Sequence, residues 1–191
     1  MTTLSVAVTG RLDEPEPITV EEVRHQGYFP IYDLTDSVQA DLYAKENLDI
    51  SHMITAVREQ CEKYTNRMVI GADIAAALLY ESHEMRGYLP YPPVREVGSV
   101  TPSFSHNPLP ATDYTLGPGS MLIIDHAGHG CDWGPAAYNV AYESGYPEDQ
   151  VPTLLRQSLL EYVSAMWDKR DGNLPLPENV RFTWDRFRFD H

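Results

Sequence analysis

The sequence predicts an α+β fold in which a small helical bundle brackets an antiparallel β-rich insert and is followed by an extended C-terminal tail. Two segments, residues 47–70 and Thr153–Lys169, repeat apolar residues at helical spacing. Between them, short apolar runs alternate with turn-forming residues, which favours strands over about residues 71–147. A chain of 191 residues suits one ordinary domain. We therefore expect a single domain over residues 1–172 and a separate tail over residues 173–191.

The N-terminal part of the chain predicts an extended arm followed by short helices. Residues 1–17 end in the turn-forming sequence DEPEP and are interpreted as the arm. Thr19 followed three residues later by Glu22 is the pattern of a capping box, so a short helix begins at Thr19 and ends before Pro30. Residues 36–45 could add one or two further helical turns.

Residues 47–70 form the clearest amphipathic helix of the sequence. Its apolar side chains fall on one face of a helical repeat of about 3.6 residues: Ile50, Met53, Ile54, Val57, Cys61 and Tyr64. We expect Asp49 to cap the N-terminus, Tyr64 to pack in the core and Asn66 to end the helix in a left-handed conformation. A lone helix of this length is marginal in water, so it must pack on another element.

The partner that we expect for this helix is Thr153–Lys169, which has a broad apolar face. Leu159 and Trp167 are the residues of this segment that we assign to the structural core. Pro152 stands in the first turn, where proline is tolerated, and Gly172 ends the helix. The two helices would therefore pair although they are far apart in the sequence.

Residues 72–81 are ambiguous, because their alanines suit a helix while their position suits a strand. The short runs bounded by turn residues that follow them favour the strand. Further strands are expected at residues 94–100, 113–116, 121–124 and 138–142.

The net charge of −14 restricts the classes of function. Residues 1–50 hold ten acids and three bases, so half of the net charge lies there. Such a surface argues against wrapping nucleic acid, which needs basic clusters, although DNA could slide past it without sticking. The simplest interpretation of the charge is solubility.

The sequence has no apolar run of about 18 residues that would predict a membrane span, no basic start of a signal peptide, and too few cysteines for a disulfide framework.

The most tempting cluster for chemistry lies in a Gly-rich loop between Asp125 and Asp132. His126, His129 and Cys131 could bind zinc, with one of the two aspartates as a fourth ligand. Their spacing matches no strong zinc signature, and no second half-site of two ligands stands elsewhere in the sequence. A solvent loop without metal is therefore the simpler interpretation, and a small metal-dependent enzyme built on this loop is the alternative function. The sequence also lacks a phosphate-binding loop and a nucleophile elbow, so we expect no catalytic residue and no cofactor.

The tail mixes aromatic residues with arginine, which is typical of an interface anchor. The residues that we expect to contact another subunit are Phe182, Trp184, Arg186, Phe187, Arg188 and Phe189. An alternative is that the tail packs back on its own core as a last strand. A platform for single-stranded nucleic acid is disfavoured by the acidic chain behind it.

Six short phrases in order resemble the head–tail connector proteins (adaptor, or head-completion, proteins) of long-tailed bacteriophages, prophages and gene transfer agents. These phrases are PITVEE at residues 17–22, EKYTNR at 62–67, PPVREV at 92–97, DYTL at 113–116, YESGY at 142–146, and VP with WDKR at 151–152 and 167–170. The resemblance covers residues 17–172. Asn66 replaces the usual glycine, which is compatible with a left-handed cap. Residues 29–47 are longer and more acidic than the family pattern, and the aromatic tail is not part of it.

The resemblance implies a structural virion protein without enzymatic activity, made in the host cytoplasm and located in the neck between capsid and tail. Copies would form a ring, dodecameric in the family, beneath the portal protein. The ring would extend the DNA channel, through which genomic DNA passes without sequence-specific binding. It would also offer a surface to the tail or to the next (stopper) completion protein. No membrane is involved.

Overall fold

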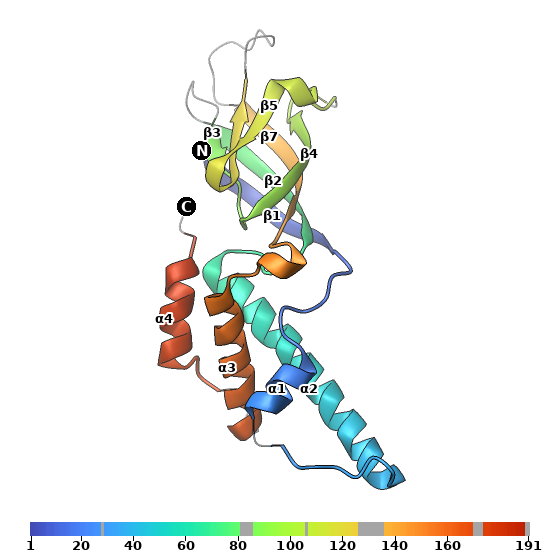
Figure 1. Cartoon of the computed structure of the whole chain (residues 1–191). Helices are drawn as coiled ribbons and strands as arrows, with labels where there is room; N and C mark the ends of the chain where they lie inside the picture. Colours follow the sequence, from blue (N-terminus) through green and yellow to red (C-terminus); the bar gives the residue numbers. More distant parts are fainter. Residues whose placement is uncertain (28, 81–85, 106, 126–135, 170–173, 190–191) are drawn as a thin grey trace. The chain divides into compact units, whose positions relative to one another are not determined.

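The computed structural model describes residues 1–27, 29–80, 86–105, 107–125, 136–169 and 174–189, and within them the chain is mixed α and β as predicted. The chain forms two compact units. We call the first, Met1–Glu14 with Asn66–Asp149 and Phe189–His191, the strand unit. The second, Pro15–Thr65 with Gln150–Arg188, is the helical unit. Figure 1 labels the helices and most of the strands of the two units.

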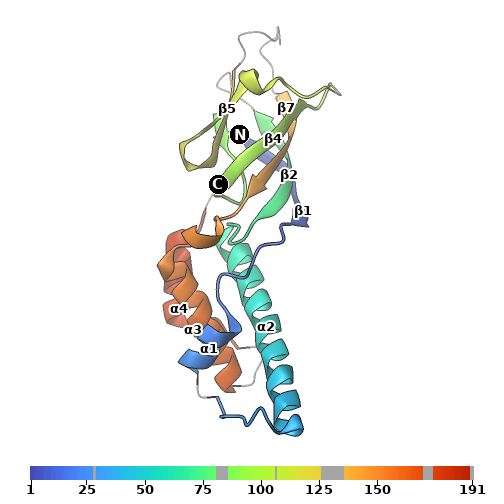
Figure 2. The ribbon, with the colours of Figure 1, turned by 45° about the vertical axis from the view of Figure 1, so that its right-hand side comes forward.

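The described part of the strand unit holds two antiparallel sheets. A four-stranded sheet has the order β1-β2-β7-β4 and contains β1 (Thr2–Arg11), β2 (Ala72–Tyr80), β4 (Val94–Pro102) and β7 (Ala136–Ser144). A three-stranded sheet has the order β3-β6-β5 and contains β3 (Arg86–Tyr88), β5 (Tyr114–Gly117) and β6 (Met121–Ile124). Figure 2 shows β2, β4 and β7 side by side. Short 3-10 turns are Ala111–Asp113, Pro118–Ser120 and Glu148–Gln150.

The alanine-rich segment is strand β2, as its position predicted. Its side chains alternate strictly, so that Ile74 and Leu78 are buried while Asp73 and Ala75 are exposed. The inward residues join a core with Leu89, Val100, Leu122, Tyr138 and Val140. The strands predicted further along the chain overlap β4, β5, β6 and β7 and are confirmed.

The N-terminal arm is a paired strand rather than a free extension. β1 pairs antiparallel with β2, from Thr2 opposite Leu79 to Arg11 opposite Ala72, and the pairing has two register shifts, after Thr3 and after Val8. The local sequence of residues 1–17 predicts an extended backbone. It contains no signal for pairing with β2, which is far away in the sequence.

An ion cluster joins the end of β1 to the sheet of the same unit. The Arg95 guanidinium on β4 donates to the Glu14 carboxylate at 3.0 Å and to Glu143 on β7 at 3.1 Å. Glu14 also accepts the backbone N–H of Gly71 at 2.8 Å. The hydrogen bond from Arg95, opposed by partial burial, lowers the pKa of Glu14 below its usual value. The carboxylate is therefore held in its charged form.

The helical unit contains α1 (Val20–Gln26), α2 (Ser37–Thr65), α3 (Thr153–Lys169) and α4 (Glu178–Phe187) among the residues described. The capping box predicted at the start of α1 is present, since Thr19 and Glu22 each accept a backbone N–H of the other. α3 has the predicted bounds and packs against α2, which confirms the predicted pair. The shared core is built from Ile50, Ile54, Val57 and Cys61 of α2, Leu155, Leu159, Tyr162 and Val163 of α3, Val23 of α1, and Ile18 just before α1.

The start of α2 corrects the expectation for Asp49. The helix begins at Ser37, so Asp49 lies inside it on the exposed face and caps nothing. The residue that caps α2 is Asp36, whose side chain accepts the backbone N–H of Val38 at 2.9 Å. The added turns are rich in helix-forming residues, and this propensity extends the helix well beyond its apolar stripe.

The C-terminal tail is also corrected, because it is helical and not extended over Glu178–Phe187. Pro177 stands at the N-cap position of α4. Val180 and Trp184, four residues apart, are buried against the helical unit, so the tail folds back on its own core as a helix and not as a strand. The spacing of these two residues outweighs the modest helix propensity of the aromatic residues around them.

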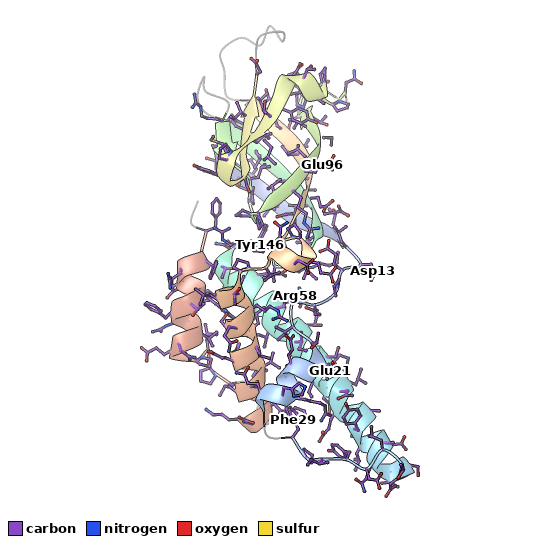
Figure 3. All side chains as sticks on the ribbon, viewed as in Figure 1. Asp13, Glu21, Phe29, Arg58, Glu96 and Tyr146 are labelled. Atoms are coloured by element: carbon purple, nitrogen blue, oxygen red, sulfur yellow. The ribbon has the colours of Figure 1, made fainter. Side chains whose placement is uncertain are left out.

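A buried arginine sits between two carboxylates in the same unit. Arg58 of α2, labelled in Figure 3, is only 4% exposed and donates to Glu16 at 2.8 Å and to Glu62 at 3.0 Å. Glu62 is itself 2% exposed. These hydrogen bonds compensate the desolvation of both charges.

Candidate interaction surface

The outer face of α4 presents an exposed aromatic ring between arginines. Phe182 is 68% exposed, and Arg181 and Arg186 are exposed beside it. The helix is anchored from its other side by Trp184, whose indole N–H donates to the Ser158 hydroxyl of α3 at 2.9 Å. Phe182 is therefore displayed on a rigid element, which lowers the entropy cost of using it in a contact.

Trp184 cannot be the interface anchor that the sequence indicated. Its side chain is fully buried, with ring centroids 5.8 Å from Tyr64 and 5.9 Å from Tyr162. The composition of the tail did not distinguish aromatic residues that face inward from those that face outward. Beside it, Phe187 is half-buried and Arg188 is exposed.

Phe189, the last aromatic residue of the tail, belongs to the strand unit. Its backbone carbonyl accepts a hydrogen bond from the Asn66 side chain at 3.2 Å. Its ring lies edge-on to Tyr88, with centroids 6.0 Å apart, and the Arg67 guanidinium lies 5.6 Å from its centroid. Asn66 itself has a φ of 53°, the left-handed conformation, directly after the last residue of α2.

The remaining residues that the sequence singled out lie inside or along the helical unit. The Tyr64 hydroxyl donates to the Asp185 carboxylate of α4 at 2.6 Å, and this hydrogen bond raises the pKa of Tyr64. Leu159 is buried between the helices. Trp167, near the end of α3, is half-buried and stacks on Phe29 with centroids 4.9 Å apart.

Sequence reasoning missed a groove along the exposed side of α2. We call it the α2 groove, and it is lined by Leu42, Lys45, Glu46, Asp49, His52, Met53 and Ala56 of α2 with Met166 and Trp167 of α3. Its volume is about 650 Å³. The signal was present in the sequence, because Val38 and Leu42 stand at helical spacing ahead of the stripe that begins at Ile50.

The candidate metal ligands of the Gly-rich loop, His126, His129 and Cys131, are not among the residues that the structure describes. Within the residues that are described, no group of three or more His, Cys, Asp or Glu side chains is placed to hold a metal ion. Cys61 is buried in the helical core, and this burial raises the pKa of its thiol well above the usual value, so the thiol is unreactive there. None of the helices in the described ranges combines the length and hydrophobicity that a membrane span requires.

Comparison with known proteins shows a shared fold. No family model matches the chain, and no curated protein matches its sequence. The fold matches a chain of the "Neck of empty GTA particle computed with C6 symmetry", where GTA is a gene transfer agent. The TM-score is 0.68 at 16% identity, and the match covers 98% of this chain and 97% of that one.

Two further solved structures have a similar chain. One is the "Virion of native gene transfer agent (GTA) particle", with a TM-score of 0.64, 16% identity, and coverage of 98% of this chain and 97% of that one. The other is the "Neck of native GTA particle computed with C12 symmetry", with a TM-score of 0.60, 17% identity, and coverage of 85% and 94%. The chain therefore has the same fold as chains of GTA particles over almost its whole length.

Proposed function

We propose that this protein is a structural protein of the neck of a phage-like particle, and more specifically a head–tail adaptor that forms a ring beneath the portal. The observation that carries the proposal is the fold, which is similar over 98% of the chain to a chain of a GTA neck. Two of the similar structures are GTA necks computed with C6 and C12 symmetry, which supports a ring of copies.

The surface of the chain fits this role. With a net charge of −14, a ring of copies would present DNA with a wall that does not retain it, so the genome could pass without sequence-specific binding. The phrases that resemble adaptor proteins fall on structural elements, because EKYTNR ends α2 and PPVREV enters β4. In this proposal the partners are other copies, the portal protein and the next completion protein or tail, and the place of action is the virion neck after synthesis in the host cytoplasm.

The experiment that tests the adaptor function mixes the purified protein with portal assemblies of the same particle and images them by negative-stain electron microscopy. We expect an added ring of density with twelvefold symmetry on one end of each portal. A protein that leaves portal assemblies unchanged at a large molar excess would contradict the adaptor proposal.

Within the tail, we propose that the exposed residues of α4 make the contact with the portal or a neighbouring copy. Deleting residues 174–191 cannot test this, because the deletion also removes Trp184 from the core. A cleaner variant is Phe182→Glu, since the side chain is exposed. The matched control is Leu154→Glu, which places the same charge on an exposed leucine of α3. We expect Phe182→Glu to reduce portal decoration at least tenfold and Leu154→Glu to leave it unchanged; equal decoration by both variants would refute the role of Phe182.

A further inference from the structure

The α2 groove is one end of a longer apolar and acidic surface of the helical unit. Ile31, Leu34, Val38 and Leu42 are all at least half exposed. In both ribbon views the first turns of α2 extend away from α1, α3 and α4 (Figures 1 and 2). Exposed apolar side chains gathered in one region mark a contact surface.

The charge of this region indicates which surface it would bind. Residues 31–49 hold five acids and one base, Lys45, which gives a net charge of −4. Residues 178–188, which are α4 and the residue that follows it, hold three arginines and two acids, a net charge of +1 in a chain whose total is −14. The α4 segment is thus locally basic in an acidic chain, and its charge is opposite to that of residues 31–49.

The two surfaces also match in chemistry. The groove has the apolar side chains of Leu42, Met53 and Met166 along its lining. Phe182 offers an exposed ring that could bury there, and its arginine neighbours would face Asp49. Buried aromatic anchors supply most of the affinity of an interface, while exposed ion pairs contribute about 0–1 kcal/mol each and fix orientation.

A single copy cannot make this contact with itself. α4 is joined to the C-terminal end of α2 by the hydrogen bond between Tyr64 and Asp185. Leu42 stands 22 residues before Tyr64 on the same helix, which corresponds to about 33 Å along the helix axis. The α4 helix is only about 15 Å long, as its ten residues dictate, so Phe182 does not reach the Leu42 end of the groove.

We propose that Phe182 and the flanking arginines on α4 of one copy bind the α2 groove of a second copy. The contact joins two different surfaces, so each copy offers a free groove and a free α4 face to the next. Such a head-to-tail contact closes into a ring when the rotation between copies permits. The inference rests on the proposed function for the closed ring, but the contact itself can be measured without a portal.

The test uses two variants that each destroy one surface: Phe182→Glu on α4 and Leu42→Asp in the groove. Both side chains are exposed, so folding should be retained, and circular dichroism verifies this. The matched control is Leu48→Asp, an exposed leucine of the same helix outside the groove. Self-association is measured by sedimentation velocity over a concentration series.

The wild type should associate in a concentration-dependent way, and Leu48→Asp should match its association constant within twofold. Phe182→Glu and Leu42→Asp alone should each weaken association at least tenfold. Their equimolar mixture should form a species of twice the 21.6 kDa monomer mass and nothing larger, because one intact contact remains and cannot propagate.

Three results would overturn the inference: a wild type that stays monomeric throughout, a control as damaging as Leu42→Asp, or a mixture that behaves like the single variants. Failure of the adaptor function is distinguishable, because it would leave this association intact while portal decoration is absent.

Discussion

Replacing Trp184 with alanine tests whether α4 is part of the core of the helical unit. The side chain is fully buried between Tyr64 of α2 and Tyr162 of α3, and its indole N–H is paired with Ser158. Truncating a buried tryptophan to alanine costs about 3–5 kcal/mol, through lost burial and the cavity left behind. We expect Trp184→Ala to lower the free energy of unfolding of the helical unit by that amount.

The assay is urea unfolding followed by far-UV circular dichroism, which is dominated by the helices. With an m value of about 2 kcal/mol/M, the loss lowers the unfolding midpoint by about 2 M. Phe182→Ala on the same helix is the control, because Phe182 is exposed, and we expect its effect to remain within about 0.5 kcal/mol.

Ser158→Ala separates the hydrogen bond from the packing. It leaves the indole N–H buried without its acceptor, at a cost of about 1–3 kcal/mol, while the ring contacts remain. Equal urea unfolding midpoints for Trp184→Ala and Phe182→Ala would refute the placement of α4 in the core. They would also refute the assignment of Trp184 to the inner face and of Phe182 to the outer face of α4.

Three further perturbations have defined outcomes. Arg58→Ala removes the cation between two carboxylates and leaves Glu62 buried, so chemical denaturation should show a loss of about 3–5 kcal/mol; a loss below about 1 kcal/mol would contradict the buried pair. Gly145→Ala places a Cβ against a backbone carbonyl at a φ of +123°, so the strand unit should lose at least about 1–3 kcal/mol, and a thermal melt equal to wild type would contradict this geometry. The pKa of Glu14 is lower in the folded chain than its usual value of 4.5 in the unfolded chain. The Glu14 carboxylate therefore stabilises the strand unit at pH values above 4.5, and this contribution is lost as the pH falls below 4.5 toward the folded pKa. Thermal melts should therefore show Glu14→Gln less stable than wild type near neutral pH, and the difference should shrink as the pH is lowered below 4.5, whereas a constant difference would argue against the hydrogen bond from Arg95.

The elements with strong local signals were predictable from the sequence. The capping box at Thr19 marks the start of α1, and the broad apolar face of Thr153–Lys169, bounded by a proline and a glycine, marks α3. The turn-bounded runs identified β2 despite its alanines, because its alternation satisfies a buried sheet face better than a helix. In each case local propensity and tertiary packing agree.

The errors arose where two local signals compete. Asp49 is a good capping residue in isolation, but Asp36 begins a longer stretch of helix-forming residues. The expectation of an extended tail overlooked the spacing of Val180 and Trp184, which already indicates a helix. Which residues of the tail face inward depends on the position of Ser158 in another helix, and no local pattern contains that information. The candidate surface around Phe182 was therefore not predictable from the tail alone.

The pairing of β1 has a consequence for how the chain is made. Every β1–β2 pair joins residues at least 61 positions apart, from Arg11 opposite Ala72 to Thr2 opposite Leu79. At a synthesis rate of about 5–20 residues per second, β1 waits about 3–12 s for its partner strand. The strand carries apolar side chains and only one charge, so it is open to wrong pairings during that interval. β2 in turn waits for β7, since Ala72 pairs with Ser144, and the sheet of the strand unit is completed only late in translation.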